Sequence, residues 1–162
     1  MDVSGYNHSD SITITRPPED VYAIVSDVTR MGELSPVCQS CAWDDPAQAG
    51  EEGAWFTGNN AIGEFTWATH CKLVAAEAGR EFTFINHGPN GEVELVRWGY
   101  TFEPQGDGTR ATESWQVLPA YPDFVRAGDP NLDVQGRIEG MAQMARDGIK
   151  HTLANLKRVA ES

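Results

Sequence analysis

The stretch SPVCQSCAW, residues 35–43, carries two of the three cysteines of this 162-residue chain, Cys38 and Cys41. Their spacing is that of zinc sites and of thiol redox sites, in which two sulfur atoms bind one metal ion or close into a disulfide. On a regular strand, residues three apart point to opposite faces, so we expect the two thiols to lie apart. Only Cys71 and a histidine are available to complete a metal site, and none is predicted. All three cysteines are interpreted as small buried hydrophobic residues.

Glu113 is the main candidate for acid-base chemistry. It lies in the stretch TRATESWQVL, where Ala111, Trp115 and Val117 form an apolar alternate set and Glu113 falls among them. A carboxylate on the inner face of a strand loses hydration, so its pKa rises and it can act as a general acid or base. The alternative is a structural carboxylate that pairs with an arginine or lies at the wet end of a cavity.

Other inward positions carry groups that can line a binding site. Asn60 and Tyr100 can each hold a carbonyl group of a ligand, with Tyr100 as a second catalytic candidate, or they can satisfy polar groups of the core. Aromatic stripes are usually core, and they become a binding site only where a void lies beside them. The predicted wall consists of Phe56, Phe65, Trp67, Phe82, Phe84, Trp98, Phe102 and Trp115, with Met141 and Ile149 from the last helix.

The elements that must position these residues follow from periodicity. Residues 11–15 alternate as a short strand, and residues 18–28 have apolar positions at helical spacing, followed by a helical turn that ends before Pro36. Turn signals that contain glycine then divide the chain into apolar-rich runs. We predict strands near 37–44, 54–60, 64–75, 81–87, 92–104 and 109–118, then a loop, and a last amphipathic helix over 131–160.

A sheet with one apolar face has to bury that face, and the last helix is the only element long enough to cover it. We therefore predict an α+β helix-grip architecture: a curved, seven-stranded antiparallel sheet with two short helices, which grips the long C-terminal helix and encloses a hydrophobic cavity. Residues 1–10 are predicted to be a polar N-terminal tail, and residues 11–162 a single domain.

Charge and composition exclude several function classes. The chain has 24 acidic and 12 basic side chains and a net charge of -12, which repels nucleic acid and anionic membranes. No apolar run approaches the roughly 18 residues of a membrane span, and the N-terminus lacks signal-peptide features, so we expect a cytoplasmic protein without membrane insertion. No phosphate loop, nucleotide fingerprint or nucleophile-base pair is present, and no cofactor is predicted.

The order of elements and several motifs resemble the helix-grip fold of the START and Bet v 1-like (SRPBCC) superfamily, and within it the bacterial polyketide cyclase/dehydrase-like branch. The matching stretches, which cover about residues 10 to 160, are PPEDVYAIVSDVTRMGELSP, AWFTGNN, EFTWATHCKLV, WGYTFEPQGDGTRATES and GIKHTLANLKRVAE. The resemblance implies an internal cavity for a hydrophobic small molecule such as a lipid, sterol or polyketide. It does not imply one reaction, because the superfamily includes cyclases, hydrolases, lipid carriers and co-chaperone-like modules.

Three functions follow as hypotheses. The first is binding of a hydrophobic small molecule in the cavity, because many apolar and few ionisable residues are predicted to point inward. The second is a polyketide cyclase or dehydratase, in which Glu113 transfers a proton while Tyr100 and Asn60 hold carbonyl groups. The third is a protein-interaction module, which a solid core without a pocket would favour. The chain is expected to be a monomer or a homodimer.

Overall fold

A seven-stranded antiparallel sheet with the strand order β1-β7-β6-β5-β4-β3-β2 is the framework of the computed structural model, which describes residues 1–162. Glycines with positive φ angles allow tight turns between consecutive strands, as at Gly63 between β3 and β4 and at Gly106 between β6 and β7. The strands are β1 (Asn7–Ile14), β2 (Cys38–Trp43), β3 (Trp55–Ile62), β4 (Phe65–Glu77), β5 (Glu81–Asn86), β6 (Val96–Gln105) and β7 (Gly108–Val117).

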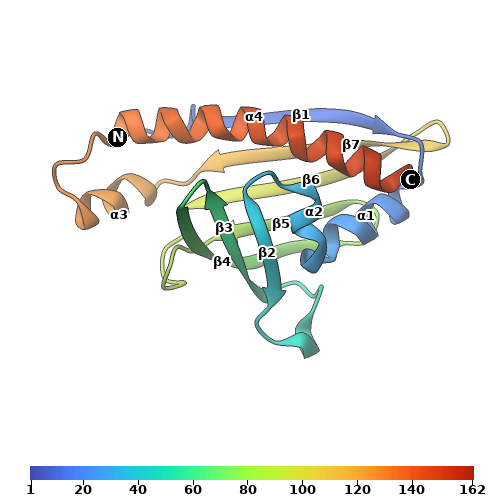
Figure 1. Cartoon of the computed structure of the whole chain (residues 1–162), viewed down its shortest axis with the longest axis horizontal. Helices are drawn as coiled ribbons and strands as arrows, with labels where there is room; N and C mark the ends of the chain where they lie inside the picture. The colour runs from blue at the N-terminus through green and yellow to red at the C-terminus, as the bar shows by residue number, and fades with distance from the viewer.

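Four α-helices accompany the sheet, and the longest lies along β1 and β7 (Figure 1). They are α1 (Pro18–Ser26), α2 (Met31–Leu34), α3 (Tyr121–Gly128) and α4 (Val134–Ala160), with short 3-10 helices at Val28–Arg30 and Pro46–Gln48. Asp133 caps the start of α4 by accepting a hydrogen bond from the backbone N–H of Gly136 at 3.0 Å. None of the helices combines the length and the apolar character that a membrane-spanning helix needs. The arrangement confirms the predicted helix-grip α+β fold.

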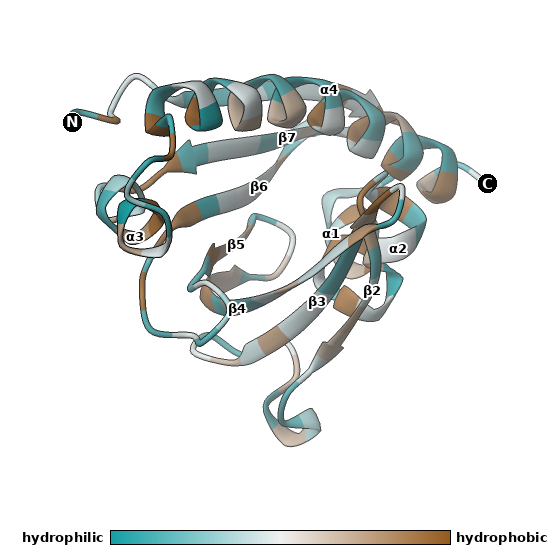
Figure 2. Cartoon of the chain, turned by 60° about the vertical axis from the view of Figure 1, so that its left-hand side comes forward, coloured by the Kyte–Doolittle hydropathy of each residue, from teal (hydrophilic) through white to brown (hydrophobic).

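The sheet is strongly bent. β1, β7 and β6 run along α4, whereas β2 and β3 turn beneath it and run across it (Figure 1). In the turned view of Figure 2, α4 lies above β7 and β6, and β3 and β4 lie apart below them. Cross-strand partners continue one inner face from strand to strand: Asp10 lies opposite Glu113, Glu113 opposite Tyr100, and Tyr100 opposite Phe82. This row of residues crosses four strands of the sheet.

Two clusters of buried apolar side chains form the core. The larger lies beneath α1, α2 and the end of α4, and includes Phe82 and Leu156. The smaller lies between α3, the earlier part of α4 and the strands β6 and β7, and includes Trp115 and Ile149. Trp98 of β6 packs against both clusters. The apolar core therefore has two parts, which Trp98 joins.

Three elements differ from the predictions. β1 begins at Asn7, inside the predicted polar tail of residues 1–10, because residues 7–14 pair with β7 along their whole length. β6 begins at Val96 rather than near residue 92. The predicted loop before the last helix contains α3, whose Tyr121 is buried in the smaller cluster. Burial of one face stabilises such a short helix more than its intrinsic propensity does.

Candidate functional site

Glu113 of β7 and Tyr100 of β6 meet on the inner face of the sheet. They are direct cross-strand partners, which brings their side chains within reach of each other. The Tyr100 hydroxyl donates a hydrogen bond to Oε1 of Glu113 at 3.0 Å. Both residues are only 3% exposed. The other carboxyl oxygen, Oε2, is buried and has no hydrogen-bond partner, so one polar atom of the pair is left free to bind a further group.

Burial determines the protonation of this pair. Loss of hydration raises the pKa of Glu113 to about 8, although the hydrogen bond from Tyr100 acts in the opposite direction. Burial and the neighbouring carboxyl group raise the pKa of Tyr100 well above its usual value. At neutral pH, Glu113 is therefore mainly a neutral acid. Because Oε1 accepts from Tyr100, Oε2 is the oxygen that can carry the proton and donate it.

The pair lies at the boundary between the two apolar clusters. Ala111 and Trp115 flank Glu113 on the same face of β7, and they belong to different clusters. Trp98 flanks Tyr100 on β6, is half-buried, and packs against both clusters. Glu113 therefore has apolar side chains on both sides, where the two clusters meet. A few polar groups among apolar side chains are typical of small-molecule sites.

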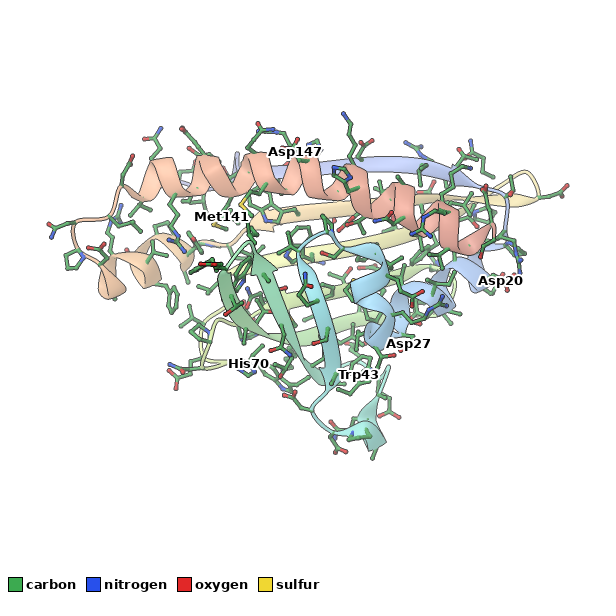
Figure 3. All side chains as sticks on the ribbon, in the orientation of Figure 1. Asp20, Asp27, Trp43, His70, Met141 and Asp147 are labelled. Carbon is green, nitrogen blue, oxygen red and sulfur yellow. The ribbon has the colours of Figure 1, made fainter.

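Much of the predicted aromatic wall is buried on this face. Edge-to-face contacts join Phe84 to Phe56 at 5.0 Å and to Phe82 at 6.2 Å between ring centroids. Met141 is half-buried and points from α4 toward the sheet (Figure 3). The rings pack against one another, so they stabilise the core as well as forming a wall. The buried members of the predicted wall are Phe56, Phe82, Phe84, Phe102, Trp115 and, on α4, Ile149.

The inner face of β4 changes from buried to exposed along its length. Leu73 is 0% exposed, whereas Phe65, on the same face at the other end of the strand, is 68% exposed. Trp67 is half-buried and stacks on Phe65 with ring centroids 5.3 Å apart. Phe65 and Trp67 therefore do not belong to the buried wall. They lie at an open end of the inner face, beside the turn between β3 and β4.

Two surface pockets open along the outer, polar side of the sheet. One, of about 440 Å³, is lined by Arg97, Thr83 and other residues of β1, β5, β6 and β7, and Trp115 is the only member of the predicted wall that touches it. The other, of about 500 Å³, lies along β1 beside Gln105 and Arg110. Neither pocket is the hydrophobic cavity predicted between the sheet and α4. That cavity remains a prediction.

Asn60 lies on β3, apart from the acidic pair. Its side-chain amide donates to the backbone carbonyl of Trp67 and to the hydroxyl of Thr69, both at 3.4 Å. The strands β4, β5 and β6 separate β3 from β7 in the sheet. The structure therefore brings Tyr100 and Glu113 together and leaves Asn60 with the neighbouring strand.

Asp10 also lies on this face, although residues 1–10 were predicted to be a polar tail. It lies on β1 opposite Glu113 and is half-buried, and its carboxylate accepts a hydrogen bond from the backbone N–H of Ser11 at 2.8 Å. The alternation of Ile12 and Ile14 extends back to Asp10, and this pattern is the signal that could have found it.

Cys38 and Cys41 lie on the same face of β2, so their predicted separation is wrong. The pairing of β2 with β3 shifts between Cys38 and Ser40, where a β-bulge inserts Gln39. The two sulfur atoms are 3.1 Å apart, and both side chains are buried. The extra residue cancels the change of face that a regular strand gives over three positions.

The comparisons with known proteins agree with this architecture. Residues 7–161 match the family described as polyketide cyclase / dehydrase and lipid transport. The solution structure of the Polyketide_cyc-like protein Cgl2372 from Corynebacterium glutamicum is 38% identical in sequence, with a TM-score of 0.70 over 99% of this chain and 94% of that chain. No protein of the curated set matches the sequence.

More distant structures share the fold. The di-domain ARO/CYC StfQ from the steffimycin biosynthetic pathway is 12% identical, with a TM-score of 0.67 over 96% of this chain and 50% of that chain. Ara h 8.0201 is 15% identical, with a TM-score of 0.64 over 95% of this chain and 96% of that chain. At these identities the likeness concerns the fold alone. The family match, which spans nearly the whole sequence, shows that the chain belongs to the polyketide cyclase/dehydrase and lipid transport family.

Proposed function

We propose that this protein binds a hydrophobic small molecule on the inner face of its sheet, with a carbonyl or hydroxyl group of the ligand at Glu113 and Tyr100. The observation that carries the proposal is the buried Oε2 of Glu113, which has no partner within the protein. A buried polar atom without a partner costs about 1–3 kcal/mol. A ligand acceptor that meets this oxygen removes that cost, whereas an apolar filling of the same space would not.

The surroundings of the pair define the class of ligand. Apolar and aromatic side chains flank Glu113 on both sides, which favours a ligand that is mainly hydrophobic. A neutral acid can donate a hydrogen bond to a carbonyl or hydroxyl oxygen, and the net charge of -12 disfavours anionic ligands. Neutral lipids, sterols and polyketide-like ketones fit this description better than fatty acid anions do.

Binding is tested with the purified protein by native mass spectrometry and by titration with fluorescent neutral lipids, sterols and aromatic ketones. We expect at least one of these classes to bind. Glu113→Leu removes the hydrogen-bond donor and should weaken that binding about tenfold. The matched control is Glu103→Leu, because Glu103 is exposed on β6. Failure of every ligand class to bind would count against the proposal, and so would equal affinity in the two variants.

A second candidate is a polyketide cyclase or dehydratase in which Glu113 transfers a proton. The pKa of about 8 favours it, since a general acid works best when its pKa is near the working pH. Tyr100 would then orient the reacting carbonyl, and Asn60 would take part only with a substrate that extends as far as β3.

Glu113→Gln separates the two candidates. The amide can still donate a hydrogen bond, so a carrier should keep most of its affinity at neutral pH. An enzyme should lose turnover by about 10²–10⁴-fold, because the amide cannot transfer the proton. Unchanged turnover of every accepted substrate in this variant would remove Glu113 from the mechanism.

A further inference from the structure

Cys38 and Cys41 form a second buried pair, on the edge strand β2. The bulge at Gln39 turns both side chains to one face, and their sulfur atoms lie 3.1 Å apart. A covalent S–S bond is about 2.05 Å long, so the two atoms need to approach by only about 1 Å to form one. The geometry thus brings together two thiols that the sequence pattern alone would separate.

The bulge is braced by the turn that precedes it. The hydroxyl of Ser35 accepts hydrogen bonds from the backbone N–H groups of Val37 and Cys38, at 3.1 and 3.0 Å. Gly32 of α2 approaches the bulge closely, since a Cβ atom there would lie 2.6 Å from the carbonyl oxygen of Gln39. The position of the thiols therefore depends on α2 and on the residues that fix it.

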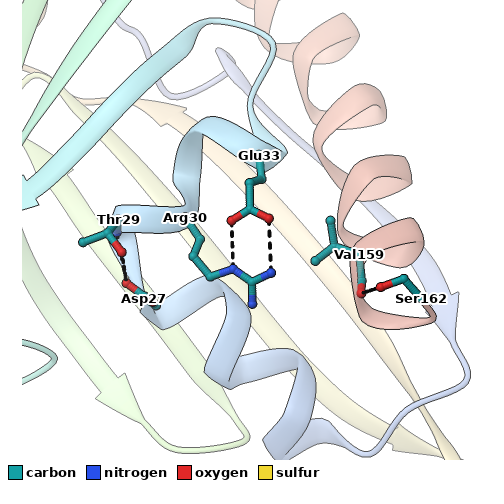
Figure 4. Close-up of polar contacts among 6 residues, drawn as sticks. All are labelled: Asp27, Thr29, Arg30, Glu33, Val159 and Ser162. Carbon is teal, nitrogen blue, oxygen red and sulfur yellow. Dashed lines mark hydrogen bonds and ion pairs between the residues drawn. The ribbon is translucent and has the colours of Figure 1, made fainter.

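Side-chain hydrogen bonds stabilise residues 27–34, the segment that contains α2 (Figure 4). Asp27 accepts hydrogen bonds from the backbone N–H and the hydroxyl of Thr29. Arg30 donates two hydrogen bonds to the carboxylate of Glu33, at 2.9 and 3.2 Å. Because this support already orders the strand, a bond between the thiols requires little further loss of conformational entropy.

Cys71 is distinct from the pair. It is 3% exposed, and burial raises its pKa to about 12. No group of three or more His, Cys, Asp or Glu side chains is gathered as a set of metal ligands. Cys38 and Cys41 keep 7% and 9% of their surface exposed. The chemistry of the pair is therefore that of two adjacent thiols.

We propose that Cys38 and Cys41 are a modification site, which a hydroperoxide oxidises reversibly to an intramolecular disulfide. The Cys38 thiolate attacks the peroxide, the O–O bond breaks, and an alcohol leaves with the Cys38 proton, so that Cys38 becomes a sulfenic acid. The Cys41 sulfur then attacks the Cys38 sulfur, the S–S bond forms, and water leaves with the Cys41 proton. Two electrons pass from the two thiols to the peroxide.

The hydrogen bond between the sulfur atoms divides the two roles. It lowers the pKa of Cys38 and raises the pKa of Cys41. Because the thiolate is the nucleophile, Cys38 is the residue that attacks the peroxide, and Cys41 is the residue that resolves the sulfenic acid.

Hydrogen peroxide is the probe that tests this site. The folded chain is treated and quenched in acid, and its mass is measured by mass spectrometry; we expect a loss of two hydrogen atoms that dithiothreitol reverses. The remaining thiols are alkylated before digestion. Trypsin leaves all three cysteines in the peptide 31–72, so cleavage after glutamate is needed. That cleavage places Cys38 and Cys41 in the peptide 34–51 and Cys71 in the peptide 65–77. The missing hydrogen atoms should be found in the first peptide alone.

Variants sharpen the assignment. Cys71→Ser should still lose two hydrogen atoms, whereas Cys38→Ser and Cys41→Ser should not. In Cys41→Ser, a dimedone adduct should mark the sulfenic acid on Cys38. A disulfide that includes Cys71 or a second chain would overturn the proposal. Stable oxygen addition without disulfide formation, or thiols that remain alkylatable in the folded chain after treatment, would overturn it as well. The peptide map of the unsubstituted chain decides the question even where a variant does not fold.

Discussion

The two ends of the inner face of β4 carry the same alternation of apolar side chains and differ in burial. Toward Leu73, the face belongs to the larger apolar cluster, together with residues of α1, α2 and the end of α4. Toward Phe65, two stacked aromatic rings lie at the surface: Phe65 is largely exposed and Trp67 is half-buried. The difference arises from what covers the strand, because the alternation is regular from Phe65 to Leu73, before the pairing with β5 shifts between Leu73 and Ala75.

This contrast assigns different tasks to the two ends. The end near Leu73, here called the closed end, should contribute more to the free energy of folding than the end near Phe65, the open end, since buried apolar area is the main stabilising contribution. The open end contributes little burial, and in the proposed function it is the approach of a hydrophobic ligand to the inner face. Glu113 lies where the two apolar clusters meet, so substitutions in either cluster should alter its surroundings.

Phe82→Ala should cause the largest loss of stability among the substitutions at the closed end. Phe82 is 0% exposed and packs edge-to-face on Tyr22 and Phe84. Removal of the ring leaves a cavity, so we expect the free energy of unfolding to fall by about 3–5 kcal/mol. Urea denaturation, followed by tryptophan fluorescence, measures this change. A loss of less than about 1 kcal/mol would show that the closed end is loosely packed.

Glu113→Gln should remove a pH dependence of stability. The folded-state pKa of about 8 lies above the ordinary value of 4.5, so between these pH values the folded chain retains a proton that the unfolded chain releases. The stabilising contribution of this proton is complete below pH 4.5 and is lost as the pH rises through 8. We expect a decrease of about 1.4 kcal/mol per pH unit within that range for the unsubstituted chain.

The measurement is a series of urea titrations between pH 5 and 8. Relative to Glu113→Gln, the unsubstituted chain should lose stability as the pH rises. Glu103→Gln makes the same chemical change at an exposed position of β6 and should follow the unsubstituted chain. Parallel curves for Glu113→Gln and the unsubstituted chain would mean that the carboxyl group keeps an ordinary pKa.

Regular strand pairing was the predictable part of this molecule. Alternation places Glu113 and Tyr100 on inward positions, and the antiparallel register of β6 and β7 makes them neighbours. The order of elements likewise predicts the sheet and the long helix that covers it. These inferences succeed because each depends only on a local period and on the need to bury one face.

The unpredicted features depend on contacts between distant segments. No glycine or proline marks the bulge at Gln39, which packs against Gly32 of α2. The spacing of Cys38 and Cys41 therefore predicted that their side chains lie on opposite faces. α3 is a short helix that is buried against the smaller cluster. The burial of Phe65 was also overestimated, because alternation identifies a face and says nothing about the element that covers it.

Gly32→Ala tests the packing of α2 against β2. A Cβ atom at Gly32 would lie 2.6 Å from a backbone oxygen of Gln39, so α2 or the bulge must move. We expect a loss of about 1–3 kcal/mol in the free energy of unfolding, together with slower disulfide formation by the neighbouring thiols. Gly140→Ala is the matched control, since no atom lies within 4 Å of a Cβ there and α4 should gain about 0.5–1 kcal/mol. Equal effects at the two glycines would contradict the close approach of α2 to β2.

Phe65→Ser should have the smallest effect on stability, although it removes a large aromatic ring. The ring is 68% exposed, so its loss should change the free energy of unfolding by no more than about 0.5 kcal/mol. Any decrease in ligand affinity in this variant then reflects contact with the ligand, because the fold is unchanged. Trp67 allows the comparison to be repeated one alternate position further in, where the side chain is half-buried and substitution should cost more. A loss at Phe65 as large as that at Phe82 would mean that the open end is covered in solution, and a hydrophobic ligand would then need another approach to Glu113.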